Sequence, residues 1–167
     1  LPTQAAESTL RPPAVPLVAC DPYFSIWSGG DRLTDVPTTH WTRKPLQLTS
    51  MVRIDDRAFR VMGAQPASVP AMKQTSLEVL PTRTIYQFEE AGVHLTLTFM
   101  TPALPGNIDL LSRPVTYLTW EAKSVDGARH TVSVYYDNTA EPVVDDPAQQ
   151  VTGSAEKIGR LVSVKFG

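Results

Sequence analysis

The chain has 167 residues, a mass of 18.3 kDa, a formal net charge of −2 and a pI of about 5.9. This length predicts one ordinary domain, and the lack of a basic excess argues against nucleic-acid binding. Hydrophobic residues make up 42% of the chain, enough to form a core. Since no stretch approaches the ~18 consecutive apolar residues of a membrane-spanning helix, we also expect no membrane span.

The first predicted segment is an extended, proline-rich lead-in over residues 1–16, followed by a single domain over residues 17–167. Prolines fix φ and remove backbone donors, which disfavours a helix in the lead-in. Cys20 follows in an apolar run and is the single cysteine of the chain, so an intrachain disulfide is excluded. We expect it to be a buried, unreactive thiol.

The next segments are a strand and a long loop. Residues 23–28 are aromatic and β-branched and lie between the turn signals Asp21-Pro22 and Gly29-Gly30, which predicts a strand. Residues 31–48 are polar and contain two prolines. This composition predicts a long ordered loop.

Two hairpins are predicted next in chain order. The first joins 51–54 to 58–62 through an acidic turn at 55–57. The second joins 82–88 to 93–99, where apolar and polar residues alternate most clearly. This period of two places four side chains on one face of the second strand: Val93, Leu95, Leu97 and Phe99.

A third hairpin is predicted to join 114–122 to 131–136, because Asp126-Gly127 between them is a favoured turn pair. Residues 137–157 are polar and rich in turn residues, with room for a short helix at 154–158, and the last strand is predicted at 160–166. No segment shows a sustained apolar stripe of helical period. Short strands joined by hairpin turns predict an all-β fold, an antiparallel β-sandwich.

Few patterns in the sequence point directly to chemistry. The three histidines, His40, His94 and His130, are scattered and have no cysteine partner, so we expect no metal site and no cofactor. Adjacent carboxylates such as Asp55-Asp56 fit solvated turn residues better than an acid–base pair. A serine–histidine–acid triad stays open, because its members need only be close in space.

The segment 21–42 is the best candidate for a binding surface. It combines aromatic, imidazole and carboxylate side chains on a loop, and binding residues are often carried by loops on a rigid scaffold. Core packing is the competing interpretation for Phe24 and at least one of the tryptophans. We therefore predict a substrate-cleft or interdomain loop that presents six residues: Asp21, Tyr23, Trp27, Asp35, His40 and Trp41.

A longer series of motifs resembles the N-terminal region of the secreted glutaminase family of fungi and bacteria. The series runs, in order, through Asp21-Pro-Tyr-Phe-Ser-Ile-Trp-Ser28, His40-Trp41-Thr42, Phe59-Arg-Val-Met-Gly63 and Val93-His-Leu-Thr-Leu-Thr-Phe-Met-Thr-Pro102. It covers about residues 10–140. Two positions depart from the family pattern: Arg43 and Asp56 stand where we expect glycine.

The resemblance implies a sandwich of the supersandwich type, galactose-mutarotase-like, which is incomplete in this chain. It implies a partner, a helical toroid domain in the remaining C-terminal part of the same protein, and the hydrolysis of L-glutamine to L-glutamate and ammonia. It also implies export, to a secreted or periplasmic location. We carry no catalytic residue over to this chain from the resemblance. Two alternatives stay open: a carbohydrate-binding or adhesion sandwich without catalysis, and the accessory domain of a glycoside hydrolase.

Overall fold

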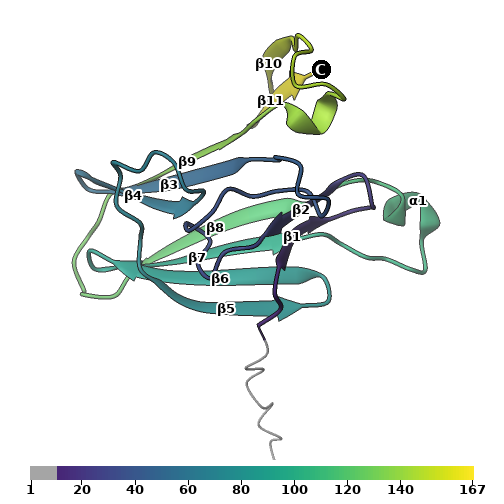
Figure 1. Ribbon diagram of the computed structural model, residues 1–167. Helices are drawn as coiled ribbons and strands as arrows, with labels where there is room; N and C mark the ends of the chain where they lie inside the picture. The colour runs from purple at the N-terminus through teal and green to yellow at the C-terminus, as the bar shows by residue number, and fades with distance from the viewer. Residues whose placement is uncertain (1–10) are drawn as a thin grey trace, which may run out of the picture.

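The computed structural model describes residues 11–167, and these residues form short antiparallel strands with very little helix (Figure 1). The predicted all-β antiparallel sandwich is therefore confirmed. Four strands form one sheet in the order β5-β6-β7-β8: β5 (Gln74–Leu80), β6 (Arg83–Glu90), β7 (Val93–Met100) and β8 (Tyr117–Ser124). Three form a second sheet in the order β4-β3-β9: β4 (Arg57–Met62), β3 (Leu48–Ile54) and β9 (Val132–Asn138).

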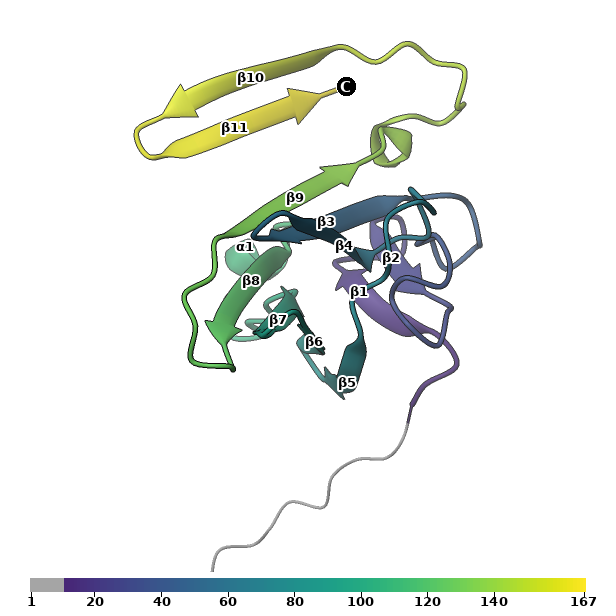
Figure 2. The ribbon, with the colours of Figure 1, turned by 90° about the vertical axis from the view of Figure 1, so that its left-hand side faces the viewer.

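Two further pairs of strands complete the fold. β1 (Val15–Ala19) pairs with β2 (Ser25–Ser28), and β10 (Gly153–Ile158) pairs with β11 (Leu161–Phe166). Figure 2 shows the two larger sheets as facing layers, with β1 and β2 closing one side and the β10–β11 hairpin lying beyond β9. The short elements α1 (Ile108–Leu111) and η1 (Glu141–Val143) lie in connections.

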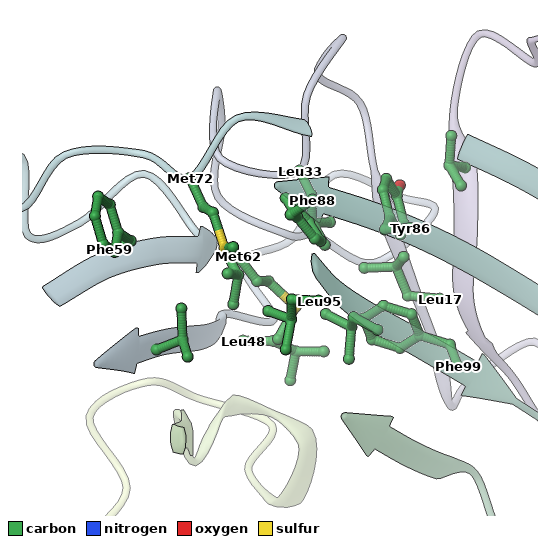
Figure 3. Packing of buried hydrophobic residues seen from close by; sticks show 14 of the residues in the cluster. Leu17, Leu33, Leu48, Phe59, Met62, Met72, Tyr86, Phe88, Leu95 and Phe99 are labelled. Atoms are coloured by element: carbon green, nitrogen blue, oxygen red, sulfur yellow. The ribbon is translucent and has the colours of Figure 1, made fainter. Parts of the chain in front are cut away.

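The core lies between the two layers. All four residues predicted for the apolar face of β7 are buried: Val93, Leu95, Leu97 and Phe99. The Tyr86 and Phe88 side chains of β6 are buried beside them. Leu48, Val52 and Ile54 of β3 supply the opposite layer. Figure 3 shows Phe88 and Leu95 facing Leu48 and Met62 across this interface. Burial of each such side chain contributes roughly 1.5–3 kcal/mol to folding, which makes alternation the main determinant of the sandwich.

The predicted third hairpin is wrong. Strand β8 pairs with β7, whereas β9 pairs with β3 in the other sheet, so the segment 125–131 crosses from one layer to the other. Asp126-Gly127 does make a turn, with Gly127 at φ +80°. A local turn signal does not decide which strands pair, because that depends on where an apolar face finds a partner.

Other differences concern the ends of the chain. The short helix considered at 154–158 is instead strand β10, which turns back into β11 through Gly159 at φ +62°. Val15 and Pro16, assigned above to the lead-in, belong to β1, and residues 1–10 lie outside the described residues. Strand β5 had no counterpart among the predicted elements. Cys20 is free but only partly buried, with Sγ 3.5 Å from the hydroxyl of Thr116.

Candidate functional site

The turn at residues 20–24 projects one aromatic ring into solvent. The carboxylate of Asp21 accepts hydrogen bonds from the N–H groups of Tyr23 (2.7 Å) and Phe24 (2.9 Å). This arrangement is an Asx turn, which explains the aspartate before the proline. As a result, the strand predicted from residue 23 begins only at Ser25, and Tyr23 is 93% exposed.

A second tip, residues 39–45, folds against that turn. The backbone of Thr39 pairs with Trp27 of β2, and His40 N–H donates to the carbonyl of Lys44 (2.8 Å). The Arg43 N–H donates back to the His40 carbonyl (2.8 Å), and Arg43 itself takes φ +70°. The left-handed conformation favours glycine, which gives a physical reason for the glycine expected at this position.

The side chains of His40 and Trp41 converge on a single carbonyl. His40 Nε2 lies 2.9 Å from the Pro22 oxygen, and the indole N–H of Trp41 donates to the same oxygen at 2.7 Å. Because a carbonyl only accepts, Nε2 must carry a proton, and Nδ1 can then accept from the Thr42 hydroxyl at 2.8 Å. The tip is therefore held to the turn while the Trp41 ring stays 60% exposed.

The remaining two predicted residues have different surroundings. The carboxylate of Asp35 accepts from the N–H of Arg32 (2.8 Å), which makes it a turn residue of the preceding loop. The ring of Trp27 is partly buried, and its buried indole N–H has no hydrogen-bond partner among residues 11–167. The structure thus brings Asp21, Tyr23, His40 and Trp41 together around Pro22. Their functional role stays a prediction.

A groove of about 610 Å³ begins at this cluster, and we call it the open groove. Asp21 and Tyr23 lie at its margin, and Asn138 adds a polar amide. The rest of the lining is mostly apolar and comes from several elements: Val18, Phe24, Leu118, Tyr136, Val143 and Phe166. A groove with an apolar lining and a few polar groups can hold a small molecule or an apolar segment of polypeptide.

The sequence reasoning missed a polar cluster of Asp55, Asp126 and His130, which we call the histidine clasp. His130 Nδ1 lies 2.9 Å from the carboxylate of Asp55, and Nε2 lies 3.0 Å from that of Asp126. The spacing of four residues between Asp126 and His130 was the one available signal. Asp55 is distant in sequence and joins them only because of the crossover from β8 to β9.

The clasp shifts the pKa of all three groups. The hydrogen bonds that His130 donates to Asp55 and, to a lesser degree, to Asp126 raise the pKa of His130 above 6.5. The bond to His130, followed by that from the N–H of Thr131, lowers the pKa of Asp55. The pKa of Asp126 is lowered by the N–H of Ala128 and then by His130. Each shift favours the charged form of its group.

Two further searches of the structure bear on function. Within residues 11–167, histidine, cysteine and carboxylate side chains nowhere gather in groups of three that could hold a metal ion. The same part of the chain contains no helix with the length and apolar character needed to cross a membrane.

Comparisons with known proteins match two consecutive parts of the chain. Residues 82–167 match a family described as a domain of unknown function (DUF5127), and residues 1–73 match another (DUF4964). Glutaminase A of Aspergillus oryzae is 30% identical over 142 residues, which cover 80% of this chain and 20% of that protein. The chain thus spans about a fifth of the length of this relative, and the predicted resemblance is confirmed. No solved structure matches the chain.

Proposed function

The chain belongs to the DUF5127 domain family and is related to the N-terminal region of glutaminases; on this premise we propose that it is the N-terminal β-sandwich portion of an exported, glutaminase-type amidohydrolase. The reaction proposed for the whole protein converts L-glutamine and water to L-glutamate and ammonia. One observation carries the proposal: the similarity to Glutaminase A extends over 80% of this chain. We assign no catalytic residue to the chain.

We propose that the partner of this sandwich is a helical toroid domain in the remaining part of the same protein. The inward face of the edge strand β9 supports such a partner. Tyr136 and Val134 of β9 share a face with the buried residues of β3, yet they are 39% and 45% exposed. Apolar side chains on the inner face of a sheet are normally covered, so this edge of the sandwich is suited to contact further polypeptide.

The cluster around Pro22 would then form a wall of the substrate cleft. Tyr23 and Trp41 are exposed, the backbone of Tyr23 is held in its turn by Asp21, and the indole of Trp41 is held by the Pro22 carbonyl, so the Trp41 ring can shape a pocket with little loss of side-chain freedom. Both ring nitrogens of His40 already have partners: Thr42 within the tip and the Pro22 carbonyl in the facing turn. We therefore give His40 a positioning role and Trp41 the contact with substrate or with the neighbouring domain.

The reaction itself is tested by incubating the complete gene product with L-glutamine and, separately, with a panel of glycosides. Ammonia release from glutamine supports the proposal. Release of sugar from a glycoside with no ammonia from glutamine would overturn it in favour of a glycoside hydrolase.

The wall is tested by His40→Ala and Trp41→Ala in the same complete gene product. We expect a lower kcat or a higher KM for both. Lys44→Ala is the matched control, because its side chain is exposed in the same tip and only its backbone carbonyl is used there. If kcat and KM of both variants equal those of the control, the proposal that this cluster lines the substrate cleft is wrong.

The exposed rings favour one second candidate, a carbohydrate-binding or adhesion sandwich. Tyr23 and Trp41 present aromatic faces of the kind on which sugar rings stack. Retention of the full chain by immobilised polysaccharides, lost in Tyr23→Ala and Trp41→Ala, would support this candidate. Passage of the chain without retention would exclude it for the polysaccharides used.

A further inference from the structure

The histidine clasp holds an imidazole ring between two carboxylates. The His130 side chain is 12% exposed, and each of its nitrogens lies about one hydrogen-bond length from an aspartate: 2.9 Å to Asp55 and 3.0 Å to Asp126. An ionised carboxylate only accepts hydrogen bonds. Both nitrogens can therefore be satisfied at once only when both carry protons, that is, when the ring is an imidazolium.

Three connections of the sandwich meet at this ring. Asp55 belongs to the turn between β3 and β4, whereas Asp126 and His130 belong to the crossover from β8 to β9. The turn between β6 and β7 approaches through Gly92, where an added Cβ would collide with the Asp126 carboxylate and lie 2.9 Å from His130 Nε2. The clasp thus lies where turns of both layers converge.

Backbone hydrogen bonds at the same place depend on this arrangement. The N–H of Asp55 donates to the Thr131 carbonyl (2.8 Å), and the N–H of Thr131 donates to the Asp55 carboxylate (2.9 Å). The N–H of Val125 donates to the carbonyl of Gly92 (2.8 Å). These bonds fasten the crossover to a hairpin turn of each sheet, so loss of the clasp would loosen one end of the sandwich.

We propose that His130 is a proton-operated lock, which in its charged form fastens the β8–β9 crossover to the turns of both layers and on deprotonation releases that end of the sandwich. A neutral ring must direct a lone pair at one of the two carboxylates, which replaces an attraction with a repulsion. Within residues 11–167, the charged groups that contact the ring are Asp55 from the β3–β4 turn and Asp126 from the crossover itself. The β6–β7 turn presents the uncharged Gly92.

The direction of the pH dependence follows from the shifted groups. The pKa of His130 is raised above its ordinary 6.5, so its stabilisation is complete below pH 6.5 and is lost as the pH rises through the folded-state pKa. The pKa values of Asp55 and Asp126 are lowered from 3.8, so their stabilisation is present above pH 3.8 and is lost as the pH falls through their folded-state values. The lock is therefore fully closed between about pH 4 and pH 6.5.

The first test measures the unmodified full chain by NMR. The histidine ring signals are titrated, with that of His130 assigned by comparison with His130→Gln, and amide exchange is followed at Asp55, Val125 and Thr131. We expect His130 to titrate above pH 6.5. Above that pH, exchange protection corrected for intrinsic rates should fall by up to about tenfold per pH unit, because opening then releases one proton.

An amide at the other end of the sandwich is the internal control. The N–H of Thr101 donates to the Thr82 carbonyl (3.1 Å), far from the clasp in the fold, and its corrected protection should show no such step. Titration of His130 at or below pH 6.5, or protection at the three clasp amides that does not change with pH, would overturn the lock.

A conservative variant separates the charge from the structure. In Asp55→Asn the amide oxygen can still accept from Thr131, and the amide N–H can donate to Nδ1 of a neutral His130, whose Nε2–H still bonds Asp126. We expect this variant to fold, to titrate His130 at lower pH and to lose the pH step in protection. Asp56→Asn, an exposed carboxylate in the same turn, should keep both at wild-type values.

Persistence of the full step in Asp55→Asn would contradict the lock. If Asp55→Asn does not fold, the titration of His130 and the amide exchange in the unmodified chain still test the proposed lock. The test uses no substrate, so its result is independent of the proposed hydrolase function.

Discussion

The two ends of the sandwich differ in how the two layers are joined. At the end that carries the histidine clasp, the turns of both layers are joined by paired charges around a nearly buried ring. Toward α1, which lies at the opposite end of the fold (Figure 1), the open groove is lined by apolar side chains, and the inward-facing Tyr136 stays partly exposed. One end satisfies its polar groups internally, whereas the other leaves apolar side chains such as Tyr136 partly exposed within residues 11–167.

From this contrast we infer that the two ends of this small domain have different roles. The largely covered imidazole of His130 needs hydrogen-bond partners, and two carboxylates of the same chain supply them at the clasp end. Exposed rings at the other end gain most when another surface covers them. In our proposal, recognition therefore belongs to the open groove and the cluster around Pro22, and the control of local stability belongs to the clasp.

The largest effect is expected in the core that both ends share. Leu97 of β7 is fully buried, and Leu97→Ala should lower the free energy of unfolding by about 2–5 kcal/mol. Thr98→Ala, on the opposite face of the same strand, is the matched control and should cost less. Urea denaturation of both variants measures the difference. Equal costs would show that the two layers do not share this core.

The next largest effect on stability is expected from a substitution that disturbs the clasp end alone. Gly92 (φ +74°) and Gly127 (φ +80°) share the left-handed conformation, but an added Cβ would collide with the clasp only at Gly92, whereas at Gly127 it would meet open space. Both alanine variants bear about 1–2 kcal/mol of backbone strain. Gly92→Ala should lose about 1–3 kcal/mol more, because its methyl group displaces the Asp126 carboxylate. Similar unfolding free energies for the two variants would contradict this packing.

A smaller effect is expected in the loop that carries the Pro22 cluster. The buried hydroxyl of Thr38 donates to the Leu46 carbonyl (2.7 Å) and accepts from the Leu48 N–H (2.8 Å). Thr38→Val leaves both backbone groups without this partner and should cost about 1–3 kcal/mol. Thr38→Ser keeps the hydroxyl and should retain most of the stability. Thermal unfolding compares the two, and equal losses would show that the hydroxyl is not needed.

The smallest effect on stability is expected from substitutions in the tip at residues 39–45. Arg43→Gly relieves a left-handed non-glycine residue and should stabilise the chain by up to about 1 kcal/mol. Lys44→Gly, at the neighbouring position, should instead destabilise the chain. Glycine there relieves no strain and only raises the conformational entropy of the unfolded chain. Differential scanning calorimetry measures both, and a lower melting temperature for Arg43→Gly would contradict the assigned strain.

The features predicted correctly from sequence are those set by local periodicity. The alternation from Val93 to Phe99 and the acidic turn at Asp55 were sufficient to predict two hairpins. The partner of β9 was predicted wrongly, since its alternation is equally compatible with β8 and with the free edge of β3. The clasp was missed for a related reason: Asp55 meets His130 only after the chain has crossed between layers.

The candidate site shows the same limit. Residue types and turn signals singled out Tyr23, His40 and Trp41, and the structure places them around Pro22. Asp35 was grouped with them by nearness in sequence, but its carboxylate is used by the turn at Arg32. Nearness in a loop predicts contact only when the hydrogen bonds of that loop are known.

The most direct test of the division between the two ends is kinetic. In the complete gene product, kcat/KM for L-glutamine is compared between Tyr23→Ala at the open end and Asp56→Asn at the clasp end, both fully folded by thermal unfolding. Tyr23 is 93% exposed in this chain, so its loss should not affect folding. We predict at least a roughly tenfold fall for Tyr23→Ala, equivalent to about 1.4 kcal/mol of transition-state stabilisation, and no change for Asp56→Asn. Equal values for the two variants would contradict the assignment of recognition to the open end.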